Sequence, residues 1–300
     1  MDEPTRHDIQ RRNRRTRWRD RLGPLSDFQP VIAYIKGRHF LDQRSIRGWR
    51  QALEQFERAA ALDPRYPAAQ AGLADTYAAM SDFGVASPAE MRPRAERAAR
   101  RALELDGQSA EGEEALGRVV FLFDWNFAEA HRRLSRATAL DPEYMPAHQA
   151  MAWVESARGH HRDAIAAAQR ALQLDPVTPA RYTELAWVLA LGGRHAEAMR
   201  EVERALQLNA QSFESHLMKG WIFEQLGKPD AAFAAYRDAQ RFGGAPEDAL
   251  RNIDAAYRAE GLPGYYRGWL ERSGRTGIIS ETSRARLYME VGQLDRALEH

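Results

Sequence analysis

Small apolar residues recur along the chain with a long and regular spacing. Two alanines seven residues apart, which fall on one face of a helix, occur in six successive segments. They are Ala52/Ala59, Ala95/Ala102, Ala130/Ala137, Ala164/Ala171, Ala198/Ala205 and Ala232/Ala239. Because small side chains let two helices approach closely, each pair predicts a helix packed tightly against a neighbour.

A stop signal follows each of these helices. The tripeptide Leu-Asp-Pro ends at Pro64, Pro142 and Pro176, and with two weakened copies and Gly244 the steps are 43, 35, 34, 34 and 34 residues. Proline disfavours α geometry in the residue before it, so the preceding helix ends there. We expect the aspartate to cap the next helix. The pattern predicts helix–turn–helix units with a 34-residue period.

The first helices carry a matching core of the form Leu-Gly-x-x-Tyr. It is present as Leu73-Ala74-x-x-Tyr77, Leu116-Gly117, Leu185-Ala186 and Gly220-x-x-Phe223. With these motifs the chain over about residues 31–300 resembles the tetratricopeptide repeat (TPR) family. Residues 34–40, 72–77 and 123–125 look more narrowly like the TPR arrays found C-terminal to bacterial winged-helix regulators and class III adenylate cyclases. The resemblance implies an all-α, right-handed superhelical solenoid of about seven antiparallel helix pairs, the C-terminal ones degenerate.

Three regions are expected along the chain. They are an arginine-rich N-terminal arm at 1–28, the TPR array at 29–244 and degenerate TPR-like helices at 245–300. The 43-residue step places about nine extra residues near 81–93, as an extended loop or a lengthened helix at one rim. Beyond Gly244 we expect a helix break at 261–264 and a last helix pair at 280–290 and 294–300.

Composition limits the chemistry that the chain can perform. It has no cysteine, no apolar run near the ~18 residues of a membrane span and no apolar segment of a secretory signal, so we expect a cytoplasmic location. P-loop, dinucleotide-binding, zinc-protease and EF-hand motifs are absent. His160 and His161 are adjacent and do not converge on one metal, while His148 and His216 share a repeat position that favours packing between helices. We therefore expect no catalysis, no metal and no cofactor.

The resemblance also implies a concave groove lined by the first helix of each unit. The position two residues after the core leucine then faces that groove and reads Asp75, Arg118, Trp153, Trp187 and Trp221. Because one period returns to the same point on the next unit, the three tryptophans should stack as a column. The predicted partner-binding residues are Trp153, Trp187, Trp221, Gln149, Thr183, Leu217 and Arg118. The alternative is that the tryptophans pack between neighbouring units.

The N-terminal arm concentrates positive charge. Residues 1–30 carry eight Arg against five Asp and Glu, and seven of these Arg lie within 11–21. The residues expected to contact an anionic surface are Arg11, Arg12, Arg14, Arg15, Arg17, Trp18, Arg19 and Arg21. Such a segment suits lipid, nucleic acid or an acidic protein patch, or it is a solvated tail. A tryptophan among arginines suits a membrane headgroup interface better than base stacking, so a membrane is favoured over nucleic acid.

Two functions are compatible with this sequence. The first is a non-catalytic protein–protein interaction scaffold that binds an extended or helical partner segment in its groove, with the basic arm docking it to a membrane-associated complex at the inner face of the membrane. The alternative is a sensory or oligomerising TPR segment of a transcription or signalling regulator. Nothing in the sequence identifies the partner or the oligomeric state.

Overall fold

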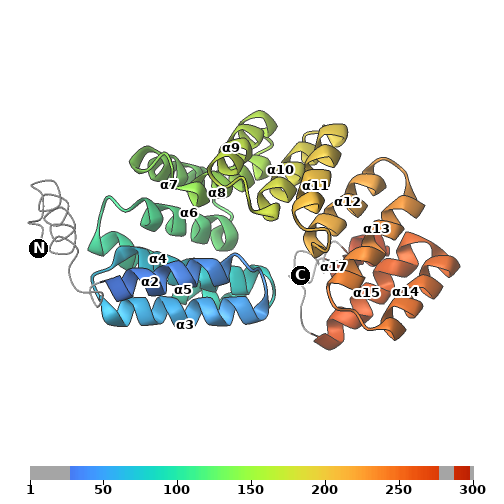
Figure 1. Ribbon diagram of the computed structural model, residues 1–300, viewed down its shortest axis with the longest axis horizontal. Helices are drawn as coiled ribbons and strands as arrows, with labels where there is room; N and C mark the ends of the chain where they lie inside the picture. Colours follow the sequence, from blue (N-terminus) through green and yellow to red (C-terminus); the bar gives the residue numbers. More distant parts are fainter. Residues whose placement is uncertain (1–27, 277–286, 298–300) are drawn as a thin grey trace, which may run out of the picture.

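The computed structural model describes residues 28–276 and 287–297. Within these residues all regular structure is helical, and the helices follow one another in packed pairs (Figure 1). The pairs are α2 (Gln29–Leu41) with α3 (Ile46–Leu62), α4 (Pro67–Asp82) with α5 (Pro88–Leu105), α6 (Ala110–Asp124) with α7 (Phe127–Leu140), α8 (Met145–Ala157) with α9 (His161–Leu174), α10 (Pro179–Leu191) with α11 (His195–Leu208), α12 (Phe213–Gln225) with α13 (Pro229–Phe242), and α14 (Glu247–Glu260) with α15 (Leu262–Thr276). The short helix α17 (Leu294–Ala297) follows.

The pairs stack in chain order along an arch, from the blue α2 and α3 to the orange α14 and α15 (Figure 1). Each helix packs against the next in sequence, and from α2 to α12 the first helices of successive units also contact one another, as α4 does α6 and α10 does α12. The first helices thereby share one side of the arch. The predicted solenoid of antiparallel helix pairs is confirmed.

The alanine pairs form the packing seams between the two helices of each unit. All twelve of these alanines are at most 3% exposed. Larger side chains lie between them, and Phe56, Leu134, Val202 and Tyr236 are buried as well. The backbone of α12 lies close to one of these side chains at Gly220, where an added Cβ would lie 2.4 Å from the ring of Tyr236.

The turns between units differ from the expectation at their aspartates. Asp63, Asp106 and Asp141 accept a hydrogen bond from the backbone N–H two residues later, at 2.9 Å in each case, and they do not cap the next helix. Several of the next helices, α4 among them, have proline in their first turn, which lacks one of the N–H groups that a cap would satisfy. Where that proline is missing, a serine caps instead, as Ser109 does for α6.

In five units the turn between the two helices contains one residue in left-handed geometry, two positions before the second helix begins. Gly159, Gly193 and Gly227 fill this position at φ of 76°, 75° and 66°. In the first and third units the residue is Arg44 at φ 46° and Trp125 at φ 53°. Left-handed geometry costs a large L-residue on the order of 1–2 kcal/mol, so these two turns are strained where the others are not.

Two further segments refine the sequence prediction. The extra residues of the long step lengthen α4 and α5 to 16 and 18 residues and form the turn at 83–87 between them. The break after α14 is confined to Gly261 at φ 67°, because α15 begins at the next residue, so the expected break at 261–264 is too long. Most of the expected helix at 280–290 lies outside the described residues. None of the described helices combines the length and apolar character of a membrane span.

Candidate functional site: the concave groove

A groove of about 640 Å³ follows the side of the arch formed by the first helices. All seven residues that the sequence predicts for partner binding line it: Arg118, Gln149, Trp153, Thr183, Trp187, Leu217 and Trp221. They come from four first helices, α6, α8, α10 and α12. The structure therefore brings the predicted set together in one concave surface.

The three tryptophans occupy one position on α8, α10 and α12, and all three are half-buried. Trp187 and Trp221 also pack against the buried core of these units. Trp153 lies beside Arg118, whose guanidinium carbon is 5.5 Å from the centre of the indole ring. The rings thus contribute both to packing and to the groove surface, so the two interpretations of the sequence do not exclude one another.

A second set of aromatic residues also lines the groove, and sequence reasoning missed it. Trp49 and Phe83 have ring centres 4.8 Å apart, while Phe127 lies 5.8 Å from Phe121 and 6.2 Å from Trp125. Trp125 is 69% exposed although its backbone is strained. One signal in the sequence could have identified this set: Trp125 stands at a turn position where other units have glycine.

The groove floor contains a buried group of charges. Asp75 lies between two arginines, 2.9 Å from Nη1 of Arg38 and 3.5 Å from Nη1 of Arg118. Glu114 is fully buried nearby, with Nε of Arg118 3.7 Å from its Oε1. Burial, reinforced by the charge of Asp75, raises the pKa of Glu114 from 4.5 to about 8. Burial thus favours the protonated form of Glu114, beside the ion pairs that Asp75 makes with the two arginines.

Arg44 extends from the α2–α3 turn to helices far along the chain. Its Nη1 lies 3.4 Å from Oε1 of Glu184 on α10 and 3.5 Å from Oε2 of Glu214 on α12. Burial opposes the charge of Arg44, but Glu214 and Glu184 outweigh it and raise the pKa of the guanidinium. Glu184 also accepts hydrogen bonds from Gln149 at 2.5 Å and Arg181 at 2.7 Å. This contact joins the first unit to the fifth and sixth.

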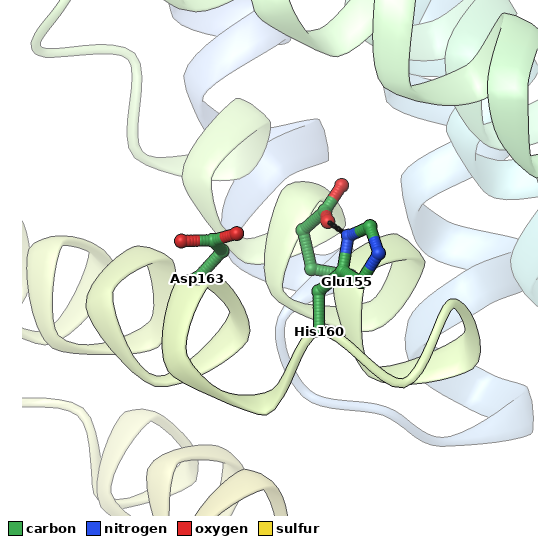
Figure 2. A group of neighbouring side chains, drawn as sticks. All are labelled: Glu155, His160 and Asp163. Atoms are coloured by element: carbon green, nitrogen blue, oxygen red, sulfur yellow. Dashed lines mark hydrogen bonds and ion pairs between the residues drawn. The ribbon is translucent and has the colours of Figure 1, made fainter.

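Outside the groove, Glu155, His160 and Asp163 have ligand atoms within 4.8 Å of one another, as a metal site would require. Figure 2 shows the ring of His160 facing Glu155, with no interaction drawn to Asp163. Both oxygens of Glu155 already accept hydrogen bonds, from His160 at 2.8 Å and from His131 and Arg158 at 2.6 and 2.8 Å. Burial opposes ionisation of Glu155, but these hydrogen bonds lower its pKa. The group is an ion-pair network between α7, α8 and the start of α9, and we assign it no metal.

His148 and His216 have a structural role in the turns between units. Nε2 of each donates to the carbonyl oxygen six residues earlier, that of Pro142 or Ala210, at 3.0 Å. At the equivalent position Tyr182 donates its hydroxyl proton to the carbonyl of Pro176, also at 3.0 Å. An imidazole and a phenol therefore make the same hydrogen bond to the turn, which requires only a hydrogen-bond donor at this position.

The family model for the tetratricopeptide repeat matches residues 36–86, 150–212 and 200–246. The helix pairs described above have the architecture of that repeat, and the chain belongs to the tetratricopeptide repeat family. Repeats of this kind are generally non-catalytic scaffolds for protein–protein interaction. No curated protein matches the chain in sequence.

Several solved structures share the fold. PilW, a widely conserved type IV pilus biogenesis factor, is 22% identical with a TM-score of 0.53, covering 77% of this chain and 99% of PilW. A monomeric mutant of IFIT1 with m7Gppp-AAAA is 16% identical with a TM-score of 0.58, covering 90% of this chain and 70% of the other. The APC/C hetero-tetramer Cut9-Hcn1 is 15% identical with a TM-score of 0.55, covering 84% and 42%. At these identities the likeness shows the fold alone.

The predicted anionic-surface residues, Arg11, Arg12, Arg14, Arg15, Arg17, Trp18, Arg19 and Arg21, lie outside the described residues. Their role stays a prediction.

Proposed function

We propose that this protein is a non-catalytic scaffold that binds a segment of a protein partner along its concave groove. The observation that carries the proposal is the convergence of Trp153, Trp187 and Trp221 on one groove, with a second aromatic set around Trp125 also lining it. Large aromatic side chains in partly enclosed surfaces dominate the binding energy of protein interfaces. A segment that follows the first helices meets one tryptophan in each of three units.

The groove also offers polar groups that can position such a segment. The hydroxyl of Thr183 is hydrogen-bonded to that of Ser215 at 2.9 Å, and the amide of Gln149 is bonded to Glu184. A small number of polar groups on a mostly apolar surface is typical of sites in which apolar contact supplies affinity and hydrogen bonds supply orientation. An amphipathic helix or an extended strand of a partner fits this description.

The arginine-rich arm extends the proposal to location. We propose that it docks the scaffold to an anionic membrane surface or to a membrane-associated complex, since seven arginines within residues 11–21 provide a strong attraction for anionic lipid.

Tryptophan variants test the groove. Trp153→Ala should weaken capture of the partner by about thirtyfold, the effect expected of a binding hot spot. Trp269→Ala is the matched control, because Trp269 is also half-buried, packs in the cluster of α12–α15 and does not line the groove. Thermal melts of both variants separate lost binding from lost stability. Equal capture by Trp153→Ala and the parent would rule out the groove as the binding surface.

A further inference from the structure

The α2–α3 turn reaches across the groove through one side chain. Helices α2 and α3 pack against each other and against α4, yet Arg44 in the turn between them meets Glu184 and Glu214, and Glu214 lies 170 residues further along the chain. Its guanidinium carbon is also 5.8 Å from the centre of the Phe83 ring, so it lies between an aromatic face and two carboxylates.

The backbone at Arg44 is strained to make this contact. Its φ of 46° is left-handed, and the equivalent turns at Gly159, Gly193 and Gly227 use glycine. Backbone strain in a non-glycine residue costs of order 1–3 kcal/mol and is concentrated at ligand sites and switch regions. Glycine would form this turn without strain. The presence of arginine therefore indicates that its side chain, and not the turn itself, has a role.

Stability alone does not account for the contact. The side chains of Arg44 and Glu214 are 24% and 33% exposed, and both ion-pair distances exceed 3.3 Å. A partly exposed, loosely made ion pair contributes about 0–1 kcal/mol, which does not offset the backbone strain. The pair is therefore open to solvent at Arg44 and Glu214, where a competing guanidinium can reach the carboxylates.

Without Arg44 the region around Glu184 and Glu214 would carry a net negative charge. Arg181 pairs with Glu184 at 2.7 Å, so one arginine would face two glutamates, close to Trp187 and Leu217 in the same groove. Two carboxylates next to an aromatic surface suit a guanidinium, which is planar, weakly hydrated and able to bond carboxylates while stacking on rings. Arg44 occupies that place in the structure.

We propose that Glu184 and Glu214 form an arginine-binding subsite of the groove, and that the partner is a protein segment in which an arginine neighbours apolar residues. The proposal rests on the proposed function. The guanidinium of the partner displaces that of Arg44, and the apolar residues beside it contact the tryptophan column. Arg44 thus competes with the partner's arginine for the same two carboxylates. When Arg44 is displaced, the α2–α3 turn loses its contact with α10 and α12.

A peptide with the sequence of residues 11–21 is a suitable probe, since it combines seven arginines with one tryptophan. Calorimetric titration would measure the affinity of this peptide for the full chain, for two variants and for their two control variants. Arg44→Gly, which fits the left-handed turn, should bind about fivefold more tightly than the parent, and Glu214→Gln about fivefold more weakly. The controls Arg47→Gly and Glu203→Gln, at exposed residues outside the groove, should match the parent. A peptide with citrulline in place of every arginine keeps the shape without the charge and should not bind.

Several results would overturn the subsite. They are an Arg44→Gly variant that binds no more tightly than the parent, a Glu214→Gln variant that behaves like Glu203→Gln, or undetectable binding to both the parent and Arg44→Gly. The groove scaffold is tested separately. Loss of partner capture in Trp153→Ala, with the Arg44 and Glu214 variants unchanged, rejects the arginine subsite and keeps the scaffold. If Trp153→Ala instead captures the partner normally while the Arg44 and Glu214 variants change the affinity, binding occurs at the carboxylates and the tryptophan column is rejected.

Discussion

Replacing Glu114 by glutamine should remove a large part of the dependence of stability on pH. Glu114 is fully buried on α6, and a hydrogen bond with Asp75 favours its protonated form. Burial, with the neighbouring charge of Asp75, raises its pKa from 4.5 to about 8. Because the folded pKa lies above the unfolded one, the folded chain keeps a proton that the unfolded chain has released. The stability from that proton is complete below about pH 4.5 and is lost as the pH rises through 8.

The size of the effect follows from the same shift. One proton held only by the folded state changes the free energy of unfolding by about 1.4 kcal/mol for each pH unit. Between pH 4.5 and about 8 the loss is on the order of 4 kcal/mol. Glutamine has nearly the shape of the protonated acid and does not titrate. We therefore expect the variant to match the parent within ~1 kcal/mol near pH 4.5, to exceed it by about 2 kcal/mol near pH 6 and to exceed it by several kcal/mol near pH 8.5.

Urea unfolding followed by circular dichroism at about pH 5.5, 7 and 8.5 would measure the difference. Glu203→Gln, at an exposed residue of α11, controls for the loss of a surface carboxylate. If Glu114→Gln loses stability with rising pH as steeply as the parent, then Glu114 does not hold a proton in the folded protein and the description of the groove floor is wrong.

Three further predictions follow from particular positions. Gly220→Ala should lower stability by roughly 1–3 kcal/mol, because its Cβ would lie 2.4 Å from the Tyr236 ring, and an unchanged melting temperature would contradict that packing. Trp125→Asn should stabilise the chain by roughly 1 kcal/mol, because asparagine tolerates φ 53°; a lower urea midpoint would mean that the ring contact with Phe127 outweighs the strain. Deleting residues 1–28 should abolish a salt-sensitive flotation with anionic vesicles, whereas a full chain that binds neither vesicles nor nucleic acid at low salt has a solvated tail.

The repeat architecture was accessible from the sequence because its causes are local and periodic. An alanine pair at Ala198 and Ala205 permits a close helix crossing wherever it occurs, and six such pairs at a regular spacing define the stacked units. The same periodicity brought Trp153, Trp187 and Trp221 to one surface, since a whole period returns to the same point on the next unit. Position within the repeat was enough to predict these three groove residues.

The other half of the groove depends on features that carry no periodic signal. Phe83 belongs to the extra residues of the long step, and Trp125 replaces a turn glycine, so neither belongs to the consensus. The contact of Arg44 with Glu214 depends on how far the arch curves over five units, which no local spacing specifies. The raised pKa of Glu114 likewise results from burial against Asp75, a residue of another unit.

Site-specific cross-linking tests the central claim most directly. A benzophenone amino acid placed at Trp153, in the groove, would be compared with the same group at Gln173, an exposed residue of α9 that does not line the groove. Irradiation in a lysate of the source cells, followed by mass spectrometry, would identify the attached peptides. The groove scaffold predicts that position 153 captures one protein through a defined segment and that position 173 captures none of it. Capture of the partner from position 173, with none from position 153, would contradict the account.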